Sequence, residues 1–198
     1  MFLFRKDPLK NKIVIVSGLP RSGTSMMMKM LEAGGVSPLT DHERAPDKDN
    51  PKGYYEYERV KEMKNGDTAW VGQAKGKSLK VIAALLQFLP ADYDYEVIFM
   101  RRSMPEILAS QKKMLERRGE DADAVADAEM AGLFARHLDE IIEWAQTQSN
   151  IHFIEIDYNQ MLIDPRPQLD VLGRFFNGAL DTGAMAEVID PELYRQRK

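Results

Sequence analysis

One stretch, GLPRSGTS at residues 18–25, constrains the fold of this chain more than any other. It follows IVIVSG (13–18), a short apolar run rich in β-branched residues, which is typical of a buried strand that enters a loop. It precedes SMMMKMLEA (25–33), which predicts a helix that the glycine pair at 34–35 ends. A glycine-rich loop between a strand and a helix turns tightly, so successive N–H groups and the positive helix end can bind phosphate or sulfate oxygens.

The loop lacks a residue that nucleoside-triphosphate loops need. Its spacing, Gly18-x-x-x-x-Gly23, is theirs, but Thr24 stands where they carry a lysine for the β- and γ-phosphates. A cation comes earlier instead, as Arg21. The neighbouring hydroxyl groups belong to Ser22, Thr24 and Ser25. A strand-to-helix turn with a capping serine and no ligand is the alternative interpretation.

The rest of the chain alternates predicted strands and helices around a polar, turn-rich excursion at 40–55. Further strands are predicted at 78–85, whose later half also fits a helix, and at 95–100 and 151–157. Further helices are predicted at 56–64, 103–119, 123–147 and 168–176. This alternation predicts parallel β-α-β units, and hence a single three-layer α/β/α domain with a mainly parallel sheet over residues 1–198.

Two polar segments are expected to meet at one edge of this sheet. Ligands of parallel sheets bind at the carboxyl ends of the strands, which places 18–25 beside 101–110. The helix predicted at 103–119 has a start signal, because Ser103 and Glu106 have the spacing of a capping box.

Composition excludes several classes of function. The formal net charge of −4 gives no general attraction to nucleic acid or anionic lipid, so any anion site must be a local concentration of cations and backbone amides. The absence of cysteine excludes disulfides, thiolate metal sites and cysteine nucleophiles. The three histidines are widely separated, so no metal site is expected. The N-terminal segment does not read as a signal peptide, and the longest apolar stretch is about half the length of a membrane helix. We therefore expect a cytoplasmic protein without a membrane span.

PRSGTS following IVIVSG resembles the 5′-phosphosulfate loop of sulfotransferases that use 3′-phosphoadenosine 5′-phosphosulfate (PAPS). In that family an Arg or Lys precedes Ser-Gly-Thr, and no lysine follows the last glycine. The resemblance implies a P-loop-like fold with PAPS as co-substrate and no metal. It also implies that the phosphosulfate is bound by Arg21, Ser22, Gly23, Thr24 and Ser25.

A second segment extends the resemblance. Family members hold the 3′-phosphate with an arginine at a strand end and a serine eight residues later, and RSMPEILAS supplies Arg102 and Ser110 in this arrangement. Arg102 is preferred to Arg101 because of this spacing, although a surface arginine followed by an ordinary helical serine would give the same sequence pattern. The stretch 151–165 also resembles the family's late strand, tyrosine and Asp-Pro. The resemblance covers about residues 13–176. The C-terminal Arg/Lys-Gly-x-x-Gly segment of the cytosolic branch is missing, which indicates a bacterial-type or divergent branch of the family.

The resemblance also suggests which residues perform the chemistry. Arg21 is the best-placed cation, and Lys80 lies where the family keeps a strand lysine, although an edge-strand lysine reaching solvent is equally compatible. Glu56 is the preferred base for an acceptor hydroxyl, with His42 as its rival. The implied acceptor is a hydroxyl or amine of a small molecule or glycan.

Two other functions remain open. One is a P-loop small-molecule kinase, which Thr24 at the lysine position and the lack of a clear Walker-B aspartate argue against. The other is a catalytically silent nucleotide-binding protein on the same fold. The helix at 123–147 could offer a homodimer face.

Overall fold

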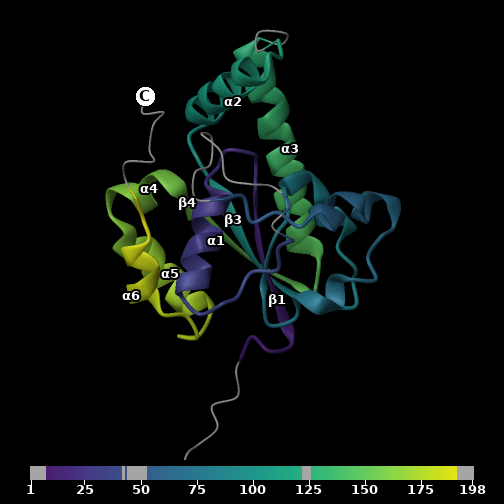
Figure 1. Cartoon of the computed structure of the whole chain (residues 1–198), viewed down its shortest axis with the longest axis vertical. Helices are drawn as coiled ribbons and strands as arrows, with labels where there is room; N and C mark the ends of the chain where they lie inside the picture. The colour runs from purple at the N-terminus through teal and green to yellow at the C-terminus, as the bar shows by residue number, and fades with distance from the viewer. Residues whose placement is uncertain (1–7, 42, 44–52, 122–125, 191–198) are drawn as a thin grey trace, which may run out of the picture.

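Four strands form a parallel sheet in the order β2-β1-β3-β4 (Figure 1). The structure is a computed structural model that describes residues 8–41, 43, 53–121 and 126–190. The strands are β1 (Lys12–Gly18), β2 (Ser78–Lys80), β3 (Asp94–Arg101) and β4 (Ile151–Asp157). Their register brings Val16 of β1 beside Ile98 of β3, and Ile98 beside Ile154 of β4, so all strands end at one edge.

One to three helices follow each strand along the chain. The α-helices are α1 (Thr24–Ala33), α2 (Met104–Arg118), α3 (Asp127–Thr147), α4 (Tyr158–Ile163), α5 (Pro165–Phe175) and α6 (Thr182–Glu187). The 3₁₀ helices are η1 (Glu58–Asn65), η2 (Val71–Ala74) and η3 (Ala83–Phe88).

Both faces of the sheet are covered, which explains why the central strands β1 and β3 are buried along almost their whole length. Successive residues of β1 point to opposite faces. Ile13 and Ile15 pack in the layer that holds η1–η3 and α3, while Val14 and Val16 pack in the layer of α1 and α4–α6 (Figure 1). This confirms the expected three-layer α/β fold with a parallel sheet.

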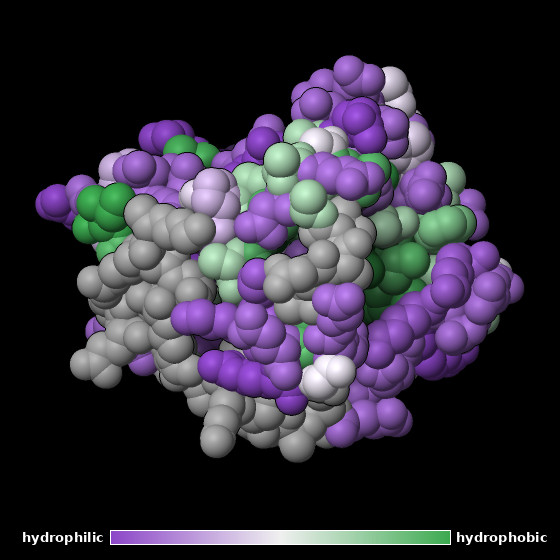
Figure 2. Space-filling view, turned by 90° about the horizontal axis from the view of Figure 1, so that it is seen from above, coloured by the Kyte–Doolittle hydropathy of each residue, from purple (hydrophilic) through white to green (hydrophobic). Residues whose placement is uncertain are grey.

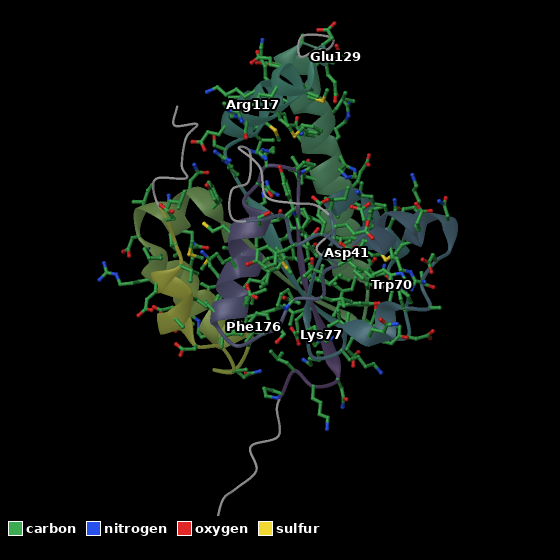
Figure 3. All side chains as sticks on the ribbon, in the orientation of Figure 1. Asp41, Trp70, Lys77, Arg117, Glu129 and Phe176 are labelled. Atoms are coloured by element: carbon green, nitrogen blue, oxygen red, sulfur yellow. The ribbon has the colours of Figure 1, made fainter. Side chains whose placement is uncertain are left out.

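Helices α2 and α3 project beyond the edge where the strands end (Figure 1). Arg117 on α2 and Glu129 on α3 lie near the outer end of this pair, far from Lys77 and Phe176 at the opposite end of the molecule (Figure 3). The Arg117 side chain is exposed at this tip. Within the described residues, no helix combines the length and the apolar character that a bilayer crossing requires.

The predicted strand at 78–85 is shorter than expected. It ends at Lys80, and η3 takes over from Ala83. Alanine and leucine favour a helical turn, and Leu85 and Leu86 bury against the same core as α3. The first part of the predicted segment is thus a strand, and its later part is a helix.

The expected capping box does not form. The Ser103 side chain makes no capping hydrogen bond at the start of α2. Its backbone N–H instead donates to the Asn159 side chain, and Glu106 pairs with Arg102. Tertiary partners outcompete the local motif here.

Candidate functional site

The loop after β1 depends on two glycines that allow close approach. Gly18 (φ 140°) and Gly23 (φ 100°) adopt backbone angles that side chains rarely tolerate. A Cβ atom on Gly18 would lie 2.6 Å from the Ser22 hydroxyl and 2.7 Å from the Met100 carbonyl oxygen. A Cβ atom on Gly23 would lie 2.3 Å from the Tyr158 ring. The loop therefore packs directly on β3 and on the start of α4.

Inside the loop, the Ser22 hydroxyl is fully buried and has no hydrogen-bond partner among the described residues. Leaving a buried hydroxyl unpaired costs roughly 1–3 kcal/mol. Thr24, at the first position of α1, is also buried. This lysine-free loop with an unsatisfied hydroxyl fits an anionic ligand at the N-terminus of α1.

Arg21 connects this loop to the second polar segment. Its φ of 74° is unusual for a residue with a side chain. Its Nε donates a 2.8 Å hydrogen bond to the hydroxyl of Ser110, which is buried on α2. The two segments expected at one sheet edge thus contact each other directly.

Arg102 lies behind this contact, at the end of β3. Its side chain is 8% exposed and forms a 3.0 Å ion pair with Glu106, whose side chain is 3% exposed. A second nitrogen donates to the Arg21 carbonyl oxygen at 2.9 Å, and the guanidinium lies 4.7 Å from the centre of the Tyr158 ring. Neighbouring Arg101 pairs instead with Glu155 at 3.3 Å. Of the two arginines, Arg102 is therefore the one that contacts the loop, and it is not a surface cation.

Lys80 brings the end of β2 to the same edge. Its Nζ donates to the Ser25 hydroxyl at 3.1 Å and to the Tyr54 carbonyl oxygen at 2.9 Å. The carboxylate of Glu56 lies 3.8 Å from it. With a side chain only 11% exposed, Lys80 does not reach into solvent. It places a cation between a loop hydroxyl and the candidate base.

The segment around Glu56 is held at both ends. The Glu56 carbonyl oxygen accepts a 2.8 Å hydrogen bond from the Thr40 hydroxyl, and Asp41 accepts the N–H of Glu58 at 2.6 Å. Asp41 lies centrally in the view of Figure 3. His42, the rival base, lies outside the described residues. Glu56 is therefore the candidate base whose position is known.

Tyr55 ties this segment to α1. Its hydroxyl donates a 2.7 Å hydrogen bond to Glu32. Burial of the ring, followed by the hydrogen bond and the negative charge of Glu32, raises the pKa of Tyr55 well above its usual range. The phenol is thus held in its neutral form.

Figure 2 looks onto the edge where the strands end, and apolar side chains gather there in a hollow bordered by polar ones. Arg21, Lys80 and Arg102 bring three cations to this edge, where Glu56 lies beside Lys80 and Glu106 pairs with Arg102. Within the described residues, no group of three or more histidine or acidic side chains is arranged to hold a metal ion. The arrangement can bind an anion with two charged ends and place a carboxylate nearby.

Two contributors to this site, Glu106 and Asn159, are not predicted by the sequence motifs, and Tyr158 belongs to the stretch that resembles the family's late strand but has no predicted role. Glu106 was assigned to helix capping, although its position four residues after Arg102 is the spacing of a helical ion pair. Asn159 and Tyr158 follow β4 directly, at the same sheet edge as the loop. Their place after a strand was the signal that could have identified them.

Comparison with solved structures found two similar domains. The sulfotransferase domain from the Synechococcus PCC 7002 olefin synthase superposes with a TM-score of 0.53 at 16% identity, covering 94% of this chain and 83% of that domain. The sulfotransferase domain from the curacin biosynthetic pathway gives a TM-score of 0.48 at 17% identity, covering 94% of this chain and 78% of that one. No family model matches the sequence, and no curated protein does.

The chain therefore has the fold of sulfotransferase domains. This confirms the fold that the resemblance of PRSGTS and its neighbouring strand implied, although identity is low. The donor, the acceptor and the activity have to be argued from the residues of the site, because a shared fold does not determine them.

Proposed function

We propose that this protein is a sulfotransferase that moves a sulfuryl group from PAPS to a hydroxyl or amine acceptor. The hydrogen bond between Arg21 and Ser110 carries the proposal, because it joins a lysine-free anion loop to a second polar segment. A donor with a phosphosulfate at one end and a 3′-phosphate at the other needs two adjacent anion sites. A sulfotransferase fold around them adds independent support.

In this proposal the two ends of the donor bind to different elements. The backbone amides of residues 22–25 and the positive end of α1 hold the phosphosulfate, assisted by the hydroxyl groups and Arg21. Arg102 and Ser110 hold the 3′-phosphate near the start of α2, where a guanidinium and a helix N-terminus both favour anions. Neither step requires a divalent cation.

Transfer then follows the logic of in-line group transfer. Glu56 removes the proton of the acceptor hydroxyl while the acceptor oxygen forms a bond to sulfur. The bond between sulfur and the phosphate oxygen breaks, and 3′-phosphoadenosine 5′-phosphate leaves. Lys80 and Arg21 offset the charge that develops on the leaving oxygen. Lys80 suits this role because it contacts Ser25 of the loop and also lies beside Glu56.

The acceptor is proposed to be a small molecule or glycan, bound at the edge that Figure 2 views. A cytoplasmic location is also a proposal. A homodimer through α3 is a further one, because Leu133 is 43% exposed on that helix.

Calorimetric titration tests the donor directly. The protein is titrated with 3′-phosphoadenosine 5′-phosphate in EDTA, and separately with ATP and Mg²⁺. Binding of the former with little for the latter is the expected result, followed by sulfate transfer over a panel of acceptors. Preference for ATP with Mg²⁺ would instead indicate a small-molecule kinase. Binding without any transfer would indicate a catalytically silent nucleotide-binding protein.

A further inference from the structure

A buried carboxylate, Glu106, contacts Arg102 of the proposed donor site and has no role in the proposal above. Glu106 accepts hydrogen bonds on both of its oxygens. Arg102 donates at 3.0 Å, and the side-chain nitrogen of Asn159 donates at 3.0 and 3.1 Å to the two oxygens. A charged group that is only 3% exposed requires such partners to remain in the interior.

The orientation of Asn159 is set by the backbone. Its side-chain oxygen accepts a 3.0 Å hydrogen bond from the N–H of Ser103, at the junction of β3 and α2. The amide nitrogen must therefore face Glu106. Consequently Glu106 has to accept from both neighbours, which a carboxylate can do. A glutamine would present its own NH₂ group either to Arg102 or to Asn159.

This network determines where the Arg102 guanidinium lies. With one nitrogen on Glu106, Arg102 donates another to the Arg21 carbonyl oxygen and stacks on Tyr158. The Tyr158 ring in turn packs against Gly23. The Arg21 carbonyl oxygen and Gly23 of the loop thus contact Arg102 and Tyr158, whose positions depend on this network.

The loop needs such support because its conformation is costly. Arg21 has a φ of 74°, and strained backbone of this kind persists only where surrounding contacts hold it. The hydrogen bond from Arg102 acts on the peptide group of this same residue.

We propose that Glu106 and Asn159 are positioning residues that hold Arg102 as a lock on the loop at residues 21–25. Their effect on donor binding rests on the proposed function, whereas their effect on the loop does not. The lock is therefore testable in the protein without ligand.

Hydrogen exchange of the full chain, followed by mass spectrometry, measures the lock. The variants are Glu106→Gln and Asn159→Ala, with Glu116→Gln as an exposed carboxylate control on the same helix. We expect exchange at the loop amides to rise about tenfold or more in both test variants, as for loss of a buried charge-assisted contact. Exchange in β1 and β3 should stay as in the wild type, and the control should match the wild type throughout. Unchanged loop exchange in Asn159→Ala would overturn the proposal.

A double variant separates the lock from general loss of stability. Arg102→Lys keeps the charge but cannot reach Glu106 and the Arg21 carbonyl oxygen with one rigid fork. Arg102→Lys combined with Glu106→Gln should speed loop exchange no more than the stronger single change, because both act through one contact. Additive effects would contradict a shared contact. Should Glu106→Gln fail to fold, Asn159→Ala combined with Arg102→Lys gives the same comparison.

Titration with 3′-phosphoadenosine 5′-phosphate adds the functional readout. The dissociation constant should rise about tenfold in Asn159→Ala while Glu116→Gln leaves it unchanged. If the wild type binds no such nucleotide, the proposed function fails, and the exchange data still decide the lock. If loop exchange rises but the dissociation constant stays unchanged, the lock exists without controlling the donor, and the inference about donor binding is wrong.

Discussion

Arg21 and Ser110 are 89 residues apart in the sequence, and a 2.8 Å hydrogen bond joins them at the edge of the sheet. The bond runs from a guanidinium in the β1–α1 loop to a buried hydroxyl on α2. It brings together the two segments that resemble the anion sites of PAPS-dependent sulfotransferases. Predictions for the site start from this pair.

Arg21→Ala should weaken binding of 3′-phosphoadenosine 5′-phosphate by about ten- to a hundredfold, because a charge-assisted contact to phosphate is lost. Calorimetry measures the change. Arg101→Ala is the matched control, since that arginine pairs with Glu155 on the neighbouring strand. Equal losses in both variants would mean that overall charge, rather than the loop, determines affinity.

Glu56→Gln should lower turnover by about a hundredfold or more, as expected for removal of a general base, while nucleotide affinity stays unchanged. The assay follows sulfate transfer to whichever acceptor the panel identifies. Glu58→Gln serves as the control, because Glu58 lies two residues after Glu56 and forms an exposed pair with Lys61. Full activity in Glu56→Gln, together with loss of activity in His42→Gln, would assign the base to His42.

Gly23→Ala should destabilise the protein more than Gly35→Ala. Both glycines have positive φ, 100° and 99°, so each substitution carries a backbone cost of about 1–2 kcal/mol. Only at position 23 would the new Cβ atom meet another group, the Tyr158 ring at 2.3 Å, which adds about 1–3 kcal/mol of overpacking. Chemical denaturation compares the two free energies of unfolding. Equal values would show that the loop does not pack on Tyr158 in solution.

Tyr55 should remain protonated in the folded protein at a pH where free tyrosine, with a pKa of about 10, is half ionised. Since the folded-state pKa is the higher one, its contribution to stability is complete below the unfolded pKa and is lost as pH rises toward the folded value. The wild type should therefore lose more stability than Tyr55→Phe between pH 8 and 10.5. Denaturation at both pH values measures this difference. Parallel losses would remove Tyr55 from the pH dependence.

Several elements could be predicted from the sequence because their signals are local. The apolar run before Gly18, the glycines of the loop and the pair at 34–35 specify β1, the turn and the end of α1 through backbone preferences alone. The strand predicted at 151–157 has the bounds that β4 has in the structure. The three-layer fold follows from the order of such elements.

Side-chain partners could not be predicted in this way. Glu106 and Ser103 have the spacing of a capping box, yet Glu106 pairs with Arg102 and Asn159. The capping-box spacing offers Glu106 one hydrogen-bond partner at the start of α2. Its burial at the junction of β3, α2 and α4 brings stronger partners within reach. A buried carboxylate takes the set of donors that satisfies both of its oxygens.

The sequence by itself therefore determined the parallel sheet and the lysine-free loop at its edge, since these depend on hydrophobic periodicity and on glycine. Only the tertiary structure decided that Arg21 donates a hydrogen bond to Ser110 and that Arg102 donates one to the loop. The same is true of Lys80, which lies between Ser25 and Glu56. These contacts join residues that are distant in the chain. Their geometry depends on how the layers pack, which no local pattern encodes.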